Sequence, residues 1–482
     1  MVFSSVVFLF FFLPAVLGVA LALQAWVNRR GGVGWPLRLA NVWLLAASLV
    51  FYAWGELRLL WVLLLSGALS FAGGLLVARC AGRARFAVLS TFVAANLALL
   101  AWFKYSGLFA DLLHRLGAQF TWSAVALPLG VSFFTFHGLS YVVDVYRGKV
   151  APTRSILDFG CYFTLFPQLV AGPIVRFSEV AAAYERRVTS LDDIAEGARR
   201  FALGLGKKVL LANQVALLAD AAFALPAAGR TAGVAWLGAI AYALQIFYDF
   251  SGYSDMALGL GRMLGFTFPE NFTQPYLARS MREFWRRWHM TLSRFFRDYL
   301  YVPLGGNRHG PLRTAVNLVL VFALCGWWHG AAWTFVAWGL FHGAFLAAER
   351  GLEPWTARAP RWTTPLAHGY TLAVVLVSWV LFRCETWPQA RAYLGAMADW
   401  RSLADLSRLP WRALAPDVQL ALAAGVVGCF PLAEAFRRLL AARPATRALH
   451  ATLATLGQLA VLAACLLAIG AGSHDPFIYF RF

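Results

Sequence analysis

The sequence has few charged residues. Of its 482 residues only 13% are Asp, Glu, Lys or Arg, whereas 60% are hydrophobic, and a soluble globular domain carries roughly 25% charged residues. No stretch is long and polar enough to form a soluble domain, so the composition excludes an ordinary soluble protein. We therefore predict one integral membrane domain that covers residues 1–482.

Acidic residues are scarcer than basic ones, which gives a formal net charge of +19. The arginines lie scattered between apolar runs and do not gather on one segment, so membrane topology explains them better than a nucleic-acid partner. The first apolar runs, near the ~20 residues that cross a bilayer, cover about 6–26, 39–54, 59–78, 86–103 and 125–143. The first has no basic residue before it and basic residues after it, which is typical of a retained anchor.

The basic residues between these runs predict how the chain is oriented in the membrane. An external N-terminus puts nine of them in the cytoplasm, namely Arg29, Arg30, Arg38, Arg79, Arg83, Arg85, Arg147, Lys149 and Arg154. Three stay outside, namely Arg58, Lys104 and Arg115. Because positive charge concentrates on the cytoplasmic side, we expect a periplasmic N-terminus.

Several chemical signatures are missing. The six cysteines stand far apart without metal-ligand spacing, so we expect neither disulfides nor a metal site. No GxSxG, Walker A or HExxH motif occurs, which argues against an ATP-driven pump.

The middle of the chain is irregular. The apolar run 159–171 is too short to cross and predicts a re-entrant or interfacial segment, and the charged stretch 176–208 is expected on the cytoplasmic surface. Two spans are expected between 209 and 260, although Asp249, Ser254 and Asp255 interrupt the second. Intramembrane carboxylates are costly, so the two acids are either functional or paired with an arginine that fixes helix packing.

Three further spans are expected near 366–383, 418–431 and 452–472. The predicted fold class is an all-α polytopic membrane protein with roughly 11 transmembrane helices, together with re-entrant or interfacial helices.

The basic segment 279–308 has apolar residues at 3,4 spacing, which predicts one amphipathic helix. The stripe consists of Trp285, Trp288, Leu292, Phe295, Phe296 and Tyr299. His289 lies at its edge, beside Arg282 and Arg286. Such a helix would turn His289 inward and the arginines toward water or an anionic ligand.

No acid, Lys or Arg occurs between Arg313 and Glu349, a run too long for one span and too short for two with a turn. Gly326 and Gly330 can break a helix there. His329 lies between them, 16 residues from Arg313 and 20 from Glu349, so we expect it near mid-bilayer in a polar cavity. Imidazole titrates near neutrality, which suits a general base, but a packed core histidine is the alternative. His342, 13 residues on, would point away from His329 along one helix.

The segment Arg279 to Gly306, with Trp-Arg-Arg-Trp-His around His289, and Trp327-Trp328-His329-Gly330 resemble the membrane-bound O-acyltransferase (MBOAT) signature. Other motifs resemble its bacterial alginate-acetylation branch: Tyr248 to Met256, Glu270-Asn271-Phe272, and the C-terminal 476–482. The resemblance covers nearly the whole chain and implies an MBOAT-like bundle with its catalytic signature in 245–349. It also implies that His329 is the catalytic base and that His289 orients a group or stabilises charge.

The resemblance further implies a reaction. An O-acetyltransferase would take its acyl group from a cytoplasmic thioester, acetyl-CoA or another, with no bound cofactor, and pass it across a bacterial inner membrane to an exported polysaccharide such as alginate. Periplasmic or membrane-anchored acetyltransferase partners would complete the modification. Arg282, Arg286 and Arg287 would bind donor phosphates or, equally, lipid headgroups. The polar candidates are Asp249, Ser254, Asp255 and Asn271.

Two alternatives stay open. The acceptor could be another envelope component: peptidoglycan, teichoic acid receiving D-alanine, or a lipid. The chain could instead be a transporter or flippase, with Asp249, Asp255 and the arginines along a transport path.

Overall fold

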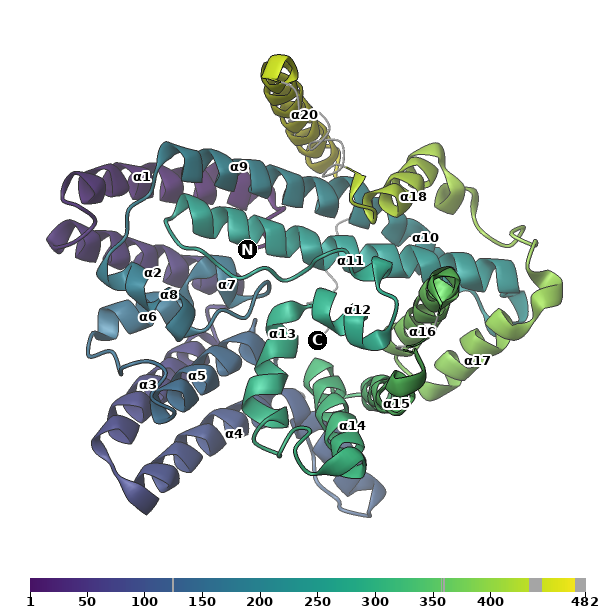
Figure 1. Ribbon diagram of the computed structural model, residues 1–482, viewed down its shortest axis with the longest axis horizontal. Helices are drawn as coiled ribbons and strands as arrows, with labels where there is room; N and C mark the ends of the chain where they lie inside the picture. The colour runs from purple at the N-terminus through teal and green to yellow at the C-terminus, as the bar shows by residue number, and fades with distance from the viewer. Residues whose placement is uncertain (124, 357, 359, 433–443, 473–482) are drawn as a thin grey trace. The chain divides into compact units, whose positions relative to one another are not determined.

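The computed structural model describes residues 1–482 except 124, 357, 359, 433–443 and 473–482 (Figure 1). The C-terminal motif 476–482 therefore lies outside the described residues. Throughout the described part the regular structure is helical, which confirms the predicted fold class. The chain divides into two compact units, one of residues 1–201 and 254–270, the other of 202–253 and 271–482.

The first unit is built from a π-helical turn and long apolar helices followed by short ones. Its elements are η1 (Phe8–Phe12), α1 (Leu13–Arg29), α2 (Trp35–Glu56), α3 (Leu60–Arg79), α4 (Gly82–Arg115), α5 (Val131–Tyr146), α6 (Ile156–Thr164), α7 (Phe166–Leu169), α8 (Phe177–Glu185) and α9 (Leu191–Gly206), the last up to residue 201. The C-terminal part of α11 (Ala232–Met263) also belongs to this unit.

Aromatic side chains hold the start of the chain in the first unit. Phe3, Phe8, Phe12, Phe51 and Phe166 contact one another, with Phe3 and Phe8 rings 4.8 Å apart and Phe12 and Phe166 rings 5.4 Å apart. These geometries are the tilted and edge-on arrangements that aromatic pairs favour. The cluster joins the π-helical turn before α1 to α2 and α7.

The second unit starts within α9. In the described residues it carries the helices after α9, apart from the C-terminal part of α11, and Figure 1 labels the α-helices among them. They are the π-helical turn η2 (Lys207–Ala212), α10 (Asn213–Ala224), the first part of α11, α12 (Met281–Arg287), α13 (Met290–Phe296), the π-helical turn η5 (Arg297–Tyr301), α14 (Gly310–His329), α15 (Trp333–Thr356), α16 (Thr364–Arg383), α17 (Trp387–Ala398), α18 (Pro416–Gly428) and α20 (Pro444–Gly470). Short 3₁₀ turns lie at Ala227–Gly229, Pro275–Leu277, Arg361–Thr363, Trp400–Ser402 and Trp411–Leu414.

Helices α14 and α15 form a close-packed hairpin. A Cβ atom on Gly326 would overlap the carbonyl oxygen of Phe335, and one on Gly339 would overlap that of Phe322. Small residues at such positions let helix backbones approach closely. The uncharged run between Arg313 and Glu349 is therefore two helices joined by a very short turn.

In the described part of the chain, nine helices are long and apolar enough to cross a membrane: Phe8–Arg29, Trp35–Glu56, Leu60–Arg79, Gly82–Arg115, Leu191–Ala224, Ala232–Met263, Gly310–His329, Thr364–Arg383 and Thr452–Gly470. The runs predicted at 125–143 and 418–431 became helices of only 16 and 13 residues. Conversely, the stretch 176–208 expected on the surface contains the start of a candidate span at Leu191. The predicted total of roughly 11 stays a prediction.

Candidate active site

His289 lies at a break between two short helices. Ser280 caps α12 by accepting the backbone N–H of Glu283, and α12 ends at Arg287. His289 itself has a left-handed backbone, with φ 41° and ψ 55°, which a non-glycine residue seldom adopts. The single amphipathic helix predicted over 279–308 is therefore wrong: the break covers only Trp288 and His289, and the 3,4 spacing of apolar residues in the sequence does not reveal it.

Asn271 supplies the groups that start the second helix. Its backbone oxygen accepts the N–H of Met290 at 2.9 Å, and its Oδ1 accepts the N–H of Thr291 at 3.3 Å. The first N–H groups of a helix lack partners inside it, so Asn271 caps α13. The same Oδ1 lies 3.0 Å from Nδ1 of His289.

His289 is buried among aromatic rings. It is 1% exposed, and its ring stands edge-on to that of Phe250 with centroids 4.6 Å apart. Burial lowers the pKa of His289 to about 3, because an apolar environment disfavours the imidazolium. His289 is therefore neutral at physiological pH, and the structure brings two sequence candidates, His289 and Asn271, together.

His329 is the last residue of α14, at the turn of the α14–α15 hairpin. It is 5% exposed, and its ring contacts Trp338 and Phe382, each at 5.2 Å between centroids. His329 thus ends a helix directly before Gly330, one of the two glycines at which the sequence allowed a break, and its position near mid-bilayer stays a prediction.

His342 comes from α15 and not from the helix of His329, so the angular argument that separated the two histidines does not apply. Nε1 of Trp285 donates to Nδ1 of His342 at 3.3 Å. Trp338 contacts both rings, that of His342 at 4.7 Å and that of His329 at 5.2 Å between centroids. The two histidines thus flank one tryptophan.

A cavity of about 610 Å³ lies between α12, α13, η5, α14 and α15. Five arginines line it: Arg282, Arg286, Arg294, Arg297 and Arg350. Glu353 pairs with Arg282 at 2.9 Å and with Arg350 at 3.2 Å, and Asp298 pairs with Arg297 at 2.7 Å. The five arginines of the lining thus outnumber these two acids.

One face of α14 lines the same cavity. Thr314, Leu318, Val321 and Cys325 all belong to its wall, at the 3,4 spacing that places residues on one helix face. His329 is four residues beyond Cys325, hence one turn further along that face. The lining of the cavity stops at Cys325 and does not include His329, so His329 lies one turn beyond the cavity on the same face of α14.

Arg287 does not line this cavity. Its guanidinium pairs with Glu283 of the same helix at 2.7 Å. Sequence reasoning missed Arg294, Arg297 and Arg350, although the first two belong to the basic segment 279–308. Only the hairpin fold brings Arg350 to the same place.

Glu349 of α15 holds the start of α12. Its carboxylate accepts the backbone N–H groups of Met281 at 2.6 Å and of Arg282 at 3.1 Å. Tyr370 donates to the same carboxylate at 3.2 Å. The segment that carries His289 is thus fixed at both helix starts, by Glu349 and by Asn271.

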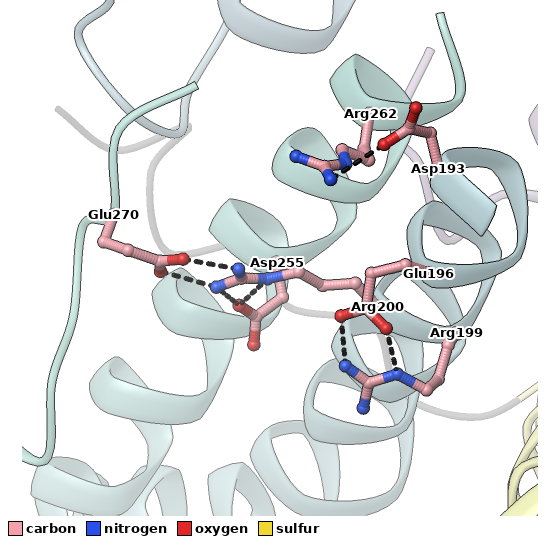
Figure 2. A network of polar contacts seen from close by, with 7 residues as sticks. All are labelled: Asp193, Glu196, Arg199, Arg200, Asp255, Arg262 and Glu270. Carbon is pink, nitrogen blue, oxygen red and sulfur yellow. Dashed lines mark hydrogen bonds and ion pairs between the residues drawn. The ribbon is translucent and has the colours of Figure 1, made fainter. Parts of the chain in front are cut away.

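The carboxylate candidates of α11 form ion pairs. In the second unit, Asp249 pairs with Lys208 of η2 at 2.8 Å, with both side chains about 2% exposed or less. In the first unit, Arg200 donates to Asp255 at 2.9 Å and to Glu270 at 2.5 Å (Figure 2). Figure 2 also shows Arg262 paired with Asp193, at 2.7 Å, and Arg199 with Glu196. Ser254 is buried. These contacts support the packing alternative for Asp249 and Asp255.

Within the described residues, no three His, Cys, Asp or Glu side chains lie close enough together to hold a metal ion.

Comparison with known proteins identifies the family. The profile of the membrane-bound O-acyltransferase family matches residues 47–384. The chain is 40% identical over 517 residues to a probable alginate O-acetylase of Azotobacter vinelandii, covering all of both proteins. It is 35% identical over 441 residues to a peptidoglycan O-acetyltransferase of Helicobacter pylori, covering 85% of this chain and 82% of that protein.

A teichoic acid D-alanyltransferase of Bacillus subtilis is 27% identical over 270 residues, which cover 53% of this chain and 68% of that protein. The shared property of these relatives is transfer of an acyl group. With the apolar helices described above and a family match over more than half of its length, the chain is a multi-pass membrane acyltransferase and belongs to the membrane-bound O-acyltransferase family.

Proposed function

We propose that the protein transfers an acetyl group from a cytoplasmic thioester donor, such as acetyl-CoA, for O-acetylation of an exported polysaccharide such as alginate. The observation that carries this proposal is the arginine-lined cavity along the face of α14 that ends in His329. Guanidinium groups pair well with phosphates, so the arginines would hold the phosphates of the donor. The apolar wall would then guide its acyl arm toward His329.

His329 would act as the general base. It would take the proton of the acceptor hydroxyl while that oxygen attacks the thioester carbonyl carbon. The carbon–sulfur bond then breaks, and the leaving thiolate recovers a proton from the imidazolium. Asp249, Ser254 and Asp255 would hold the helices in place and take no part in the chemistry.

The identity to a probable alginate O-acetylase along the whole chain favours a polysaccharide acceptor. We place the protein in a bacterial inner membrane, with its N-terminus in the periplasm and all of residues 1–482 as one functional domain. Periplasmic or membrane-anchored acetyltransferases would be its partners. Acetylation of peptidoglycan is the second candidate, because a relative 35% identical carries that name.

The test is the O-acetyl content of the polysaccharide secreted by a deletion strain that carries the wild-type protein or His329→Ala. His309→Ala is the matched control, since His309 is an exposed histidine just before the same helix. We expect acetylation with the wild-type protein and the control, and none with His329→Ala at equal membrane levels. Acetylation by His329→Ala would contradict the catalytic assignment. Unchanged polysaccharide in every strain would redirect the search to peptidoglycan.

A further inference from the structure

The atom of Asn271 that faces His289 is an oxygen. The backbone N–H of Thr291 points at it from 3.3 Å, and the hydroxyl of Thr291 lies 2.9 Å away. A backbone N–H can only donate, so the atom that receives it must be the carbonyl oxygen of the amide and not its NH₂ group. Nδ1 of His289, 3.0 Å from the same oxygen, must then carry a hydrogen in order to bond to it.

The protonation state of the other ring nitrogen of His289 follows from this. A neutral imidazole has one N–H and one lone pair, so Nε2 is an acceptor. Nε2 is buried and has no hydrogen-bond partner among the described residues. A buried polar atom without a partner costs about 1–3 kcal/mol, which argues that a bound group supplies the missing hydrogen.

The groups around the ring keep it neutral. The ring contacts described for His289 come from Phe250 of α11, at 4.6 Å between centroids, and Phe272 of the loop before α12, at 6.4 Å. Asn271 lies 3.0 Å from Nδ1, and Thr291 donates to Asn271; these two residues and the two phenylalanines are all uncharged. The low pKa of His289 agrees with this environment.

We propose that Asn271 is a positioning residue that holds His289 as the Nδ1–H tautomer, so that Nε2 accepts a hydrogen bond from a neutral donor group of the substrate. This inference rests on the proposed function and deepens it. It selects between the two roles open to His289: the residue orients a substrate and does not donate a hydrogen to the developing oxyanion. The neutral donor is either an amide N–H of the acyl carrier or a second hydroxyl of the sugar.

The tautomer can be measured without turnover. In full-length protein labelled with ¹⁵N-histidine, the His289 signals are assigned by their loss in His289→Gln. We expect a protonated Nδ1 and an unprotonated Nε2. A protonated Nε2 would overturn the proposal even if the enzyme transfers acetyl groups. Failure of the wild-type protein to consume acetyl-CoA with an oligosaccharide acceptor would instead count against the proposed function, because the NMR result needs no reaction.

Kinetics test the positioning role. In Asn271→Asp, the new carboxylate still accepts a hydrogen bond from His289. Its negative charge also favours the imidazolium form, so it should raise the pKa of His289 by about 1–3 units. Between pH 7.5 and 5.5, we expect the rate of acetyl transfer by Asn271→Asp to fall by a factor about two to five times larger than for the wild-type protein. The matched control is Asn28→Asp, because Oδ1 of Asn28 also accepts a backbone N–H, that of Thr189 in the first unit at 3.2 Å. Identical pH profiles for the two variants would sink the proposal.

Asn271→Leu removes the acceptor. We expect kcat to fall by about tenfold or more, together with a rise in KM for one substrate. A rise confined to acetyl-CoA identifies the amide of the carrier, and a rise confined to the oligosaccharide identifies a sugar hydroxyl. Unchanged kcat and KM values would leave Asn271 with a purely structural role and contradict the proposal.

Discussion

At the scale of single residues, the site combines a neutral buried histidine with a positively charged cavity. His289 lies among uncharged groups, whereas Arg282 and Arg297 of the cavity lie beside acids. These opposite environments lie within one short segment, 282–297. The cavity arginines can be tested by donor affinity, and His289 can be tested by the pH dependence of stability.

Arg286 provides the clearest test of donor binding. It lines the cavity, and no ion pair is found for it among the described residues. A hydrogen bond to a charged group is worth about 1.5–3 kcal/mol, so Arg286→Ala should raise KM for acetyl-CoA roughly tenfold or more with little change in kcat. Arg279→Ala is the control, because Arg279 is exposed, belongs to the same segment and pairs with Glu283. An equal effect of both substitutions would indicate a general charge effect.

His289 predicts how stability depends on pH. Its pKa is about 3 in the folded protein and about 6.5 when unfolded, so the unfolded chain takes up the proton first. Its contribution to stability is therefore complete above pH 6.5 and falls as the pH drops toward 3, by about 1.4 kcal/mol per pH unit. The melting temperature of wild-type protein in detergent should thus decrease more from pH 6.5 to 4.5 than that of His289→Asn. Parallel curves would show that His289 is protonated in the fold.

At the scale of helices, sequence periodicity predicted elements well where apolar runs were long and separated by charge. Besides the span bounds corrected above, it failed at two places for which the structure gives a physical reason. The break at His289 costs a single left-handed residue and is stabilised by Asn271, 18 positions away, so no local pattern marks it. The hairpin of α14 and α15 has no charged residue at its turn, because both helices pack tightly and the turn itself is buried at Gly330.

The candidate site could be predicted only in part. His329, His289 and Asn271 were found through motifs, whereas Arg350 and Lys208 were not, because only the fold places them beside their partners. Lys208 comes from a π-helical turn, a local widening that sequence spacing does not reveal.

The α14–α15 contact predicts a strict need for glycine. Gly326→Ala or Gly339→Ala would place a methyl group against a backbone carbonyl, and overpacking of this kind costs about 1–3 kcal/mol. Both should lower the melting temperature and the acetyl transfer that depends on His329. Gly351→Ala is the matched control, since Gly351 lies in α15 with nothing within 4 Å of the added Cβ. A melting temperature equal to that of the control would refute the close packing.

The buried ion pair Lys208–Asp249 predicts that the stability losses caused by removing each charge are not additive. Removing one charge by Lys208→Met or Asp249→Leu leaves the other charge buried without this partner, and breaking a buried ion pair in this way destabilises by about 3–5 kcal/mol. The double variant should recover most of that loss. For comparison, Glu196→Gln breaks the exposed pair with Arg199 and should cost less than about 1 kcal/mol. Additive losses in thermal unfolding would exclude a direct pair between Lys208 and Asp249.

At the scale of the whole molecule, the excess of basic residues predicts the topology. With the N-terminus outside and α1 to α4 each crossing the membrane, the turn after α3 lies in the cytoplasm and the loop after α4 lies outside. Single cysteines at Ala81 and Ala118, both exposed, can be tested in a background without the six native cysteines. A membrane-impermeant thiol reagent should label Ala118→Cys in intact cells and Ala81→Cys only after permeabilisation. The reverse pattern would invert the orientation.

The cap that Glu349 places on α12 also has a consequence for biosynthesis. The acceptor follows Met281 by 68 residues, which take the ribosome roughly 3 to 14 s to add. During that interval the N–H groups of Met281 and Arg282 must be satisfied by water or lipid headgroups. The segment with His289 therefore cannot reach its final hydrogen bonding until α15 has been synthesised and has folded back against α14.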